Sequence, residues 1–167
     1  VAALGTVTAA ADDGWVEVST SQELEAELTN GGSIRLTQDL NEATTYTIAA
    51  DTEVILDLNG KDINTGSYTA IICYGSLKIM DSTAVASPSV ADDYSTVEYT
   101  SGVISTSAKA VIAQKGGVIT LESGTIHSTS GNGLAAEGNI SSRDSGDEDP
   151  VYSSVIVNGG YIHAREY

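Results

Sequence analysis

Basic residues are scarce in this chain, and several classes of function depend on them. Its 167 residues include 7 Lys and Arg against 23 Asp and Glu, which gives a formal net charge of −16. Binding of nucleic acids requires clustered Lys and Arg to neutralise phosphates. The composition therefore argues against a nucleic-acid partner.

Cysteine, phenylalanine and long apolar runs are also missing or rare. Cys73 is the single cysteine, so the chain cannot form an internal disulfide, and a cysteine-based zinc site would lack its ligands. No run approaches the roughly 18 apolar residues of a membrane-spanning helix, so we expect no membrane span. The chain is 41% hydrophobic, which argues against disorder. Its length fits one domain.

The first residues, Val1–Ala11, are apolar and small, like the end of a secretory signal peptide, although no Met or basic region precedes them. We expect residues 1–14 to be an extended segment, either a leader remnant or a strand used in assembly through Val1, Leu4 and Val7. Both interpretations favour an extracellular, secreted or cell-surface location.

One helix is predicted near the N-terminus. Thr20 and Glu23 have the spacing of a capping box, and Leu24 and Leu28 follow on one helical face. Asn30-Gly31-Gly32 is a typical helix stop. We expect residues 15–32 to form a capping strand and helix that cover the end of a sheet.

From residue 33 onward, short apolar–x–apolar segments repeat at intervals of 22, 21, 42 and 36 residues. They are Ile34-Arg35-Leu36, Leu56-Asp57-Leu58, Leu77-Lys78-Ile79, Ile119-Thr120-Leu121 and Val155-Ile156-Val157. The two long intervals are explained by insertions at about residues 82–100 and 139–152. We expect the apolar members of these five segments to be buried in two columns.

Two further columns share this period. One contains Ile63-Asn64, Ile104-Ser105, Ile126-His127 and Ile162-His163, with the four isoleucines expected in the core; the other contains Ile71-Ile72-Cys73, Val111-Ile112-Ala113 and Leu134-Ala135-Ala136. Coils of three strands, stacked with one face inward, bury a continuous core. The sequence thus predicts an all-β fold: a right-handed parallel β-helix of about five coils over residues 33–167.

The segments LDLNGKDI (Leu56–Ile63), GSLKI, GGVITLESGTI and VIVNGGYI resemble the repeats of right-handed β-helix domains of the pectin-lyase-like type. Such repeats are common in secreted and surface-anchored bacterial proteins. The resemblance implies an enzyme as one alternative, because related lyases bind Ca²⁺ through acids on adjacent coils and related hydrolases use paired Asp residues.

Outward-facing columns test that alternative. Three such columns are expected. The first contains Arg35, Asp57, Lys78, Thr120 and Ile156, and the second contains Asn59, Met80, Glu122 and Asn158. The third contains Asn64, Ser105, His127 and His163. No column pairs two carboxylates, so we expect no catalytic residues. In the first column, Asp57 should project outward between Arg35 and Lys78.

Three other features suggest binding sites. The acidic residues Asp144, Asp147, Glu148 and Asp149 are weak Ca²⁺ candidates, although a solvated loop explains them as well. His127 and His163 could share a metal or respond to pH, but a simple polar ladder is favoured. Ile72, Ile112 and Ala135 form an outward apolar row, either covered by a loop or used as an interaction surface.

We therefore expect a non-catalytic structural or adhesive module of a bacterial surface protein or self-assembling fibre, with no cofactor beyond weakly bound Ca²⁺. Its partners would be further copies, joined through the N-terminal segment and the open last coil, or a glycan or host-surface ligand. The alternative is a carbohydrate-binding or carbohydrate-cleaving β-helix. Tyrosines that could contact sugars are Tyr68, Tyr74, Tyr94, Tyr99, Tyr152 and Tyr161.

Overall fold

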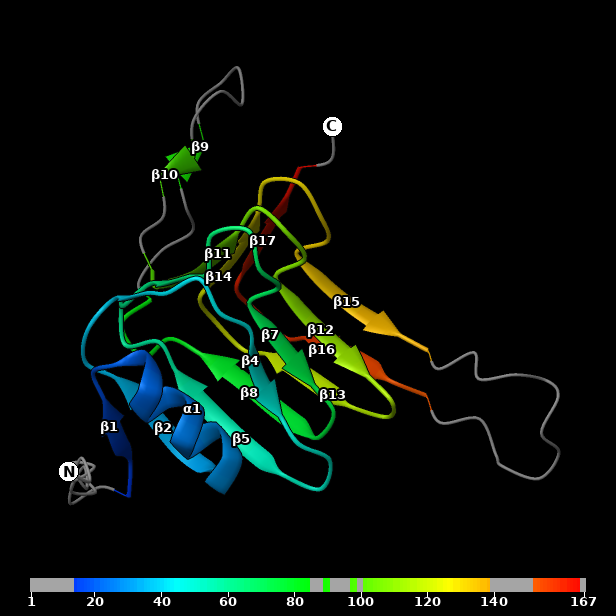
Figure 1. The fold of residues 1–167 in the computed structure, drawn as a ribbon. Helices are drawn as coiled ribbons and strands as arrows, with labels where there is room; N and C mark the ends of the chain where they lie inside the picture. Colours follow the sequence, from blue (N-terminus) through cyan, green and yellow to red (C-terminus); the bar gives the residue numbers. More distant parts are fainter. Residues whose placement is uncertain (1–13, 85–88, 91–96, 99–100, 139–151, 166–167) are drawn as a thin grey trace, which may run out of the picture.

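The protein is a stack of three parallel β-sheets with a single helix among the residues that the structure describes (Figure 1). The computed structural model describes residues 14–84, 89–90, 97–98, 101–138 and 152–165. This architecture confirms the all-β parallel fold expected from the sequence and is compatible with a β-helix.

Sheet A contains six strands in the order β1 (Val16–Val18), β2 (Gly32–Leu36), β5 (Glu53–Asp57), β8 (Ser76–Met80), β13 (Val118–Leu121) and β16 (Ser154–Val157). Sheet B contains β3 (Leu40–Asn41), β6 (Ile63–Asn64), β11 (Val103–Thr106), β14 (Thr125–Ser128) and β17 (Tyr161–Ala164). Sheet C contains β4 (Tyr46–Ile48), β7 (Ile71–Cys73), β12 (Val111–Gln114) and β15 (Leu134–Glu137). The four coils that begin with β2, β5, β8 and β13 each contribute one strand to each sheet, whereas the described part of the last coil contributes β16 and β17.

The remaining two strands lie within the insertion predicted at residues 82–100. They are β9 (Ser89–Val90) and β10 (Val97–Glu98), which pair antiparallel with each other. The chain leaves sheet A after β8 and rejoins the stack at β11, so this insertion does not interrupt the pairing of the three parallel sheets.

Helix α1 (Ser21–Asn30) packs against β1, β2 and β4 at the N-terminal end of the stack (Figure 1). The predicted capping box is present: the Glu23 amide donates to the Thr20 hydroxyl, and the Glu23 carboxylate accepts from the Thr20 amide. Leu24 and Leu28, four residues apart on one face, are fully buried. The helix therefore adds its apolar face to the core formed by the sheets.

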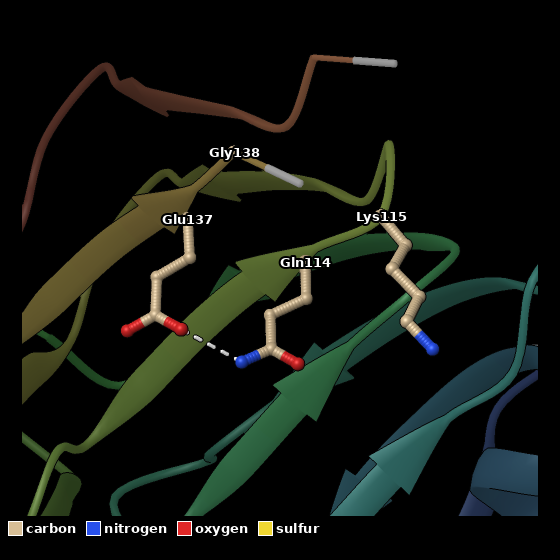
Figure 2. Close-up of a pocket in the computed structure, with 4 residues that line it drawn as sticks. All are labelled: Gln114, Lys115, Glu137 and Gly138. Atoms are coloured by element: carbon tan, nitrogen blue, oxygen red, sulfur yellow. Dashed lines mark hydrogen bonds between the residues drawn. The ribbon is translucent and has the colours of Figure 1, made fainter. Parts of the chain in front are cut away.

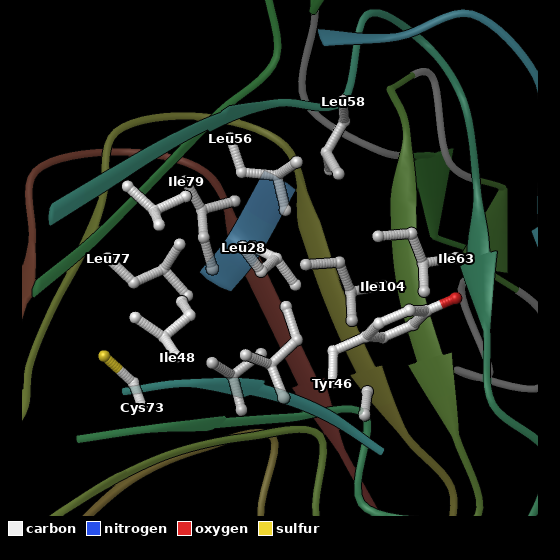
Figure 3. Packing of buried hydrophobic residues seen from close by; sticks show 14 of the residues in the cluster. Leu28, Tyr46, Ile48, Leu56, Leu58, Ile63, Cys73, Leu77, Ile79 and Ile104 are labelled. Carbon is white, nitrogen blue, oxygen red and sulfur yellow. The ribbon is translucent and has the colours of Figure 1, made fainter. Parts of the chain in front are cut away.

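Inward side chains of all three sheets form one continuous apolar core (Figure 3). Eight of the ten residues expected in the two columns of sheet A are fully buried: Ile34, Leu36, Leu56, Leu58, Leu77, Ile79, Ile119 and Leu121. In sheet B, Ile63, Ile104 and Ile126 are also fully buried. Most of the predicted core is thus confirmed.

The prediction is wrong at the last coil. Val157 is 53% exposed and Ile162 is 38% exposed, while Val155 is only partly buried. These residues belong to β16 and β17, the last strands of sheets A and B. No described strand lies beyond them, so their inward positions are covered on one side only.

The predicted Arg35–Asp57–Lys78 ladder is half correct. Arg35 is opposite Asp57, and its Nε lies 3.1 Å from the Asp57 carboxylate. Lys78, however, is opposite Ile55 and lies 3.8 Å from Glu122, whereas Asp57 is opposite Met80. Strand β8 is shifted by two residues from the expected register, and Asp57 is fully buried rather than exposed.

Replacing Leu121 by Ala should lower the free energy of unfolding by about 2–5 kcal/mol, because the side chain is fully buried and its removal leaves a cavity. Val157→Ala, at the neighbouring position of β16, should change it by about 0.5 kcal/mol or less, because Val157 is exposed. Urea unfolding followed by circular dichroism measures both. Equal effects of the two substitutions would contradict this assignment of the core.

Candidate functional site

An open groove of about 380 Å³ runs along the edge where the chain turns from sheet C into sheet A. Its walls come from the turns of three successive coils, which precede β5, β8 and β13. The residues that line it are Asp51, Thr52, Glu53, Tyr74, Gly75, Ser76, Gly116 and Val118.

Glycine allows these turns to stack closely. A Cβ atom on Gly75 would lie 2.3 Å from the Thr52 carbonyl oxygen, and one on Gly117 would lie 2.1 Å from the Cys73 carbonyl oxygen. Larger residues at these positions would force the turns apart. The close stacking places side chains from successive coils, among them Glu53 and Tyr74, along one edge.

A second, smaller hollow of about 210 Å³ continues this edge and is lined by Gln114, Lys115, Glu137 and Gly138 (Figure 2). Gln114 donates a hydrogen bond of 2.7 Å to the Glu137 carboxylate, which also pairs with Lys109. The hydrogen bonds from Lys109 and Gln114 hold the pKa of Glu137 below its usual range. Glu137 is therefore an anion at neutral pH.

Lys115 connects the two hollows. It lies between Gln114 and Gly116 in the sequence, and its Nζ is 5.4 Å from the centre of the Tyr74 ring, a cation–π distance. The edge thus presents one aromatic ring together with carboxylates, an amide and an ammonium group. Such a mixture suits a hydroxyl-rich ligand that accepts and donates many hydrogen bonds.

A second set of acids lies at the corner between sheets A and B. The Asp62 amide donates to Asp39 at 3.0 Å, and the Val103 amide donates to Asp62 at 2.9 Å. Each carboxylate therefore binds the backbone of the next coil. Burial raises the pKa of Asp62, and the negative charges of Asp39 and Asp81 add to this effect, although the bond from Val103 opposes it.

Asp81 is also enclosed at this corner, at 3% exposure. It accepts hydrogen bonds from the amides of Gly60, Gly102 and Thr83 and from the Thr83 hydroxyl. Burial alone would raise the pKa of Asp81, but these hydrogen bonds outweigh burial and hold the pKa below its ordinary value of 3.8. The carboxylate is thus a structural acceptor for three segments of the chain.

Sequence reasoning missed this acidic corner, although a signal for it exists. Asp39 and Asp62 each directly precede an inward apolar residue of sheet B, namely Leu40 and Ile63, which are paired across β3 and β6. An alignment of the turns, and not only of the strands, would have placed these two acids one above the other.

The histidine column is formed as expected. Asn64, Ser105, His127 and His163 occupy successive paired positions of sheet B. Asn41, which was not predicted, extends the column by one position. The rings of His127 and His163 are stacked, with their centres 4.8 Å apart and their planes 4° from parallel. Burial, and then the charge of His163, lower the pKa of His127.

The apolar row also forms in the expected register, because Ile72 is opposite Ile112 and Ile112 is opposite Ala135. Ile112 is only 3% exposed, however, while Ile72 and Ala135 are partly buried. The row therefore offers little open surface, and its use as an interaction surface stays a prediction.

The other predicted site residues lie outside the described part of the chain. These are the calcium candidates Asp144, Asp147, Glu148 and Asp149 and the assembly residues Val1, Leu4 and Val7. Among the described residues, no group of three or more His, Cys, Asp or Glu side chains is placed to hold a metal ion. Cys73 is buried, and burial raises the pKa of its thiol to about 11.

Comparisons with protein-family models, curated proteins and solved structures find no match for this chain. In the described residues, no helix is both long and apolar enough to cross a membrane.

Asp81→Asn should lower the free energy of unfolding at pH 7 by about 1–3 kcal/mol. Both carboxylate oxygens of Asp81 accept hydrogen bonds from backbone amides, whereas a carboxamide has only one accepting oxygen. The folded-state pKa of Asp81 is depressed, so its stabilisation is present above its unfolded-state pKa and disappears as pH falls through the folded-state value. The difference between the two proteins should therefore shrink below about pH 4.

Denaturant unfolding measured between pH 2 and 7 checks this, with Asp51→Asn, a change at an exposed acid, as the control. A difference that stays constant across the whole range would show that the Asp81 charge does not contribute.

Proposed function

We propose that this protein is a right-handed parallel β-helix of about five coils, of the pectin-lyase-like type, and that it serves as a non-catalytic structural or adhesive module at a bacterial cell surface. The observation that carries the proposal is the continuous pairing of equivalent strands in all three sheets. A right-handed path is supported by the strong preference of parallel crossover connections for that hand.

The use of the carboxylates favours a structural role over catalysis. Asp57 accepts from the Arg35 guanidinium and from the amides of Asn59 and Ser82, and Asp81 accepts from three amides. Acids engaged in this way have few lone pairs left for a substrate or a water molecule. The acids most enclosed by the fold are thus the ones that maintain it.

An extracellular location rests on the leader-like residues Val1–Ala11. The high negative charge also suits a protein that stays soluble and avoids non-specific association. Such a stack would act as a rigid spacer or display surface.

Antibodies raised against the purified chain test the location. They should label intact cells of the source organism as strongly as permeabilised cells, because an exported surface module is accessible from outside. Labelling that appears only after permeabilisation would contradict the proposal.

Incubation with acidic and neutral polysaccharides tests the absence of catalysis. We expect neither new reducing ends nor the absorbance of unsaturated uronates. Product that increases with protein concentration would instead support a lyase or hydrolase.

The groove beside Tyr74 supports a second candidate, a carbohydrate-binding module. An aromatic ring, the acids Asp51 and Glu53 and the cation Lys115 lie together along this edge. The ring would pack against a sugar face, while the charged groups would bind its hydroxyls. Since successive coils lie about 4.8 Å apart, the same edge could meet several units of one saccharide chain.

Tyr74→Ala should weaken binding of an oligosaccharide identified on a glycan array by about tenfold, equivalent to about 1.4 kcal/mol. Tyr68→Ala is the matched control, because Tyr68 is 50% exposed and does not line the groove. Isothermal titration calorimetry measures both variants. Equal losses for Tyr74 and Tyr68, or no loss for either, would argue against this groove.

A further inference from the structure

Two histidines from distant parts of the sequence meet on the outer face of sheet B. His127 on β14 is the paired neighbour of His163 on β17, and the two rings are stacked 4.8 Å apart and nearly parallel. Both side chains are partly exposed, and the Tyr161 ring lies 6.5 Å from that of His163. These are the only histidines in the chain.

We propose that His127 and His163 form a two-histidine site for a borderline divalent transition-metal ion, of which Zn²⁺ is the representative. Imidazole nitrogen is a preferred ligand of Zn²⁺, Ni²⁺ and Cu²⁺. Ca²⁺ and Mg²⁺ take oxygen ligands instead, so this site is distinct from the calcium site considered for the acidic residues. Water molecules complete the coordination of the metal.

The strand pairing brings the two rings together. Zn–N bonds of about 2.0–2.1 Å place two nitrogen ligands of a tetrahedral ion about 3.3 Å apart. The centres of the two stacked rings are 4.8 Å apart and their planes are nearly parallel, so the rings must rotate to direct one nitrogen of each toward a shared ion. Rotation about the Cβ–ring bond of histidine has a broad energy minimum, which makes this reorientation accessible.

Two features of the surroundings support the site. On the inward side of β14, the fully buried Ile126 fixes the strand that carries His127. The high negative charge of the chain raises the local concentration of cations around the site.

Calorimetric titration of the full, tag-free chain with Zn²⁺ tests the proposal, with excess Ca²⁺ present to occupy the acidic surface. We expect one Zn²⁺ per chain. His127→Gln and His163→Gln should each weaken binding by at least roughly 10- to 100-fold. Loss of a residue that only orients a metal ligand already has an effect of this size, and each of these changes removes a ligand itself. Asn64→Gln, in the same column of sheet B, is the matched control and should bind like the native chain.

Ser105→His provides a gain-of-function variant, because Ser105 is the paired neighbour of His127 on the other side. A third imidazole in the column should tighten Zn²⁺ binding. Binding that is absent from the native chain, or that is unchanged in both glutamine variants, would overturn the proposal.

NMR of the native chain gives a readout that does not depend on the folding of any variant. The ring signals of both histidines should shift together, at the same Zn²⁺ concentration. A shift of one ring alone, or of neither, would overturn the shared site.

Discussion

Pairing between strands one coil apart is the interaction on which the rest of the structure depends. Because each strand of the three sheets takes its hydrogen-bond partners from the coil before or after it, the register of one coil positions the side chains of the next. Insertions are accepted only where the chain can leave the stack and return in register, as it does between β8 and β11. The columns of like residues, apolar inside and polar outside, follow from this constraint.

At the corners, hydrogen bonds from backbone amides to carboxylates connect successive coils in place of strand pairing. Where the chain turns between sheets A and B, the amides of Asp62, Val103 and Gly102 are bound by the side chains of Asp39, Asp62 and Asp81. The negative charge of the buried Asp57 is balanced by an ion pair with Arg35. The Arg35 guanidinium also lies 4.7 Å from the centre of the Trp15 ring. Part of the strong acidity of the chain therefore stabilises the fold, since an unpaired carboxylate at these positions would be costly.

The sequence was sufficient to predict the period, the inward positions and the capping helix, because each depends on local spacing. It could not determine the register between β5 and β8: Val54, Leu56 and Leu58 are all apolar, so a shift of two residues leaves the inward pattern unchanged. It also could not show that Val157 and Ile162 are exposed, because they repeat the core pattern and only the stack shows that no described strand covers them. Asp39 and Asp62 were missed because strands, and not turns, were aligned.

These constraints also determine which positions of the fold are available for binding a ligand. Most inward positions are apolar, with Thr106 and Ser128 as buried polar exceptions, and the corner acids are occupied by backbone amides. Outward columns and the turns between sheets C and A are therefore left for ligands. Both candidate sites lie there: the groove beside Tyr74 and the stacked pair of His127 and His163. Neither would be recognised as a motif along the chain, because their members come from different coils. In a stack of this kind, residues that act together are neighbours in successive coils. A functional site is therefore recognised from the side chains that share a column.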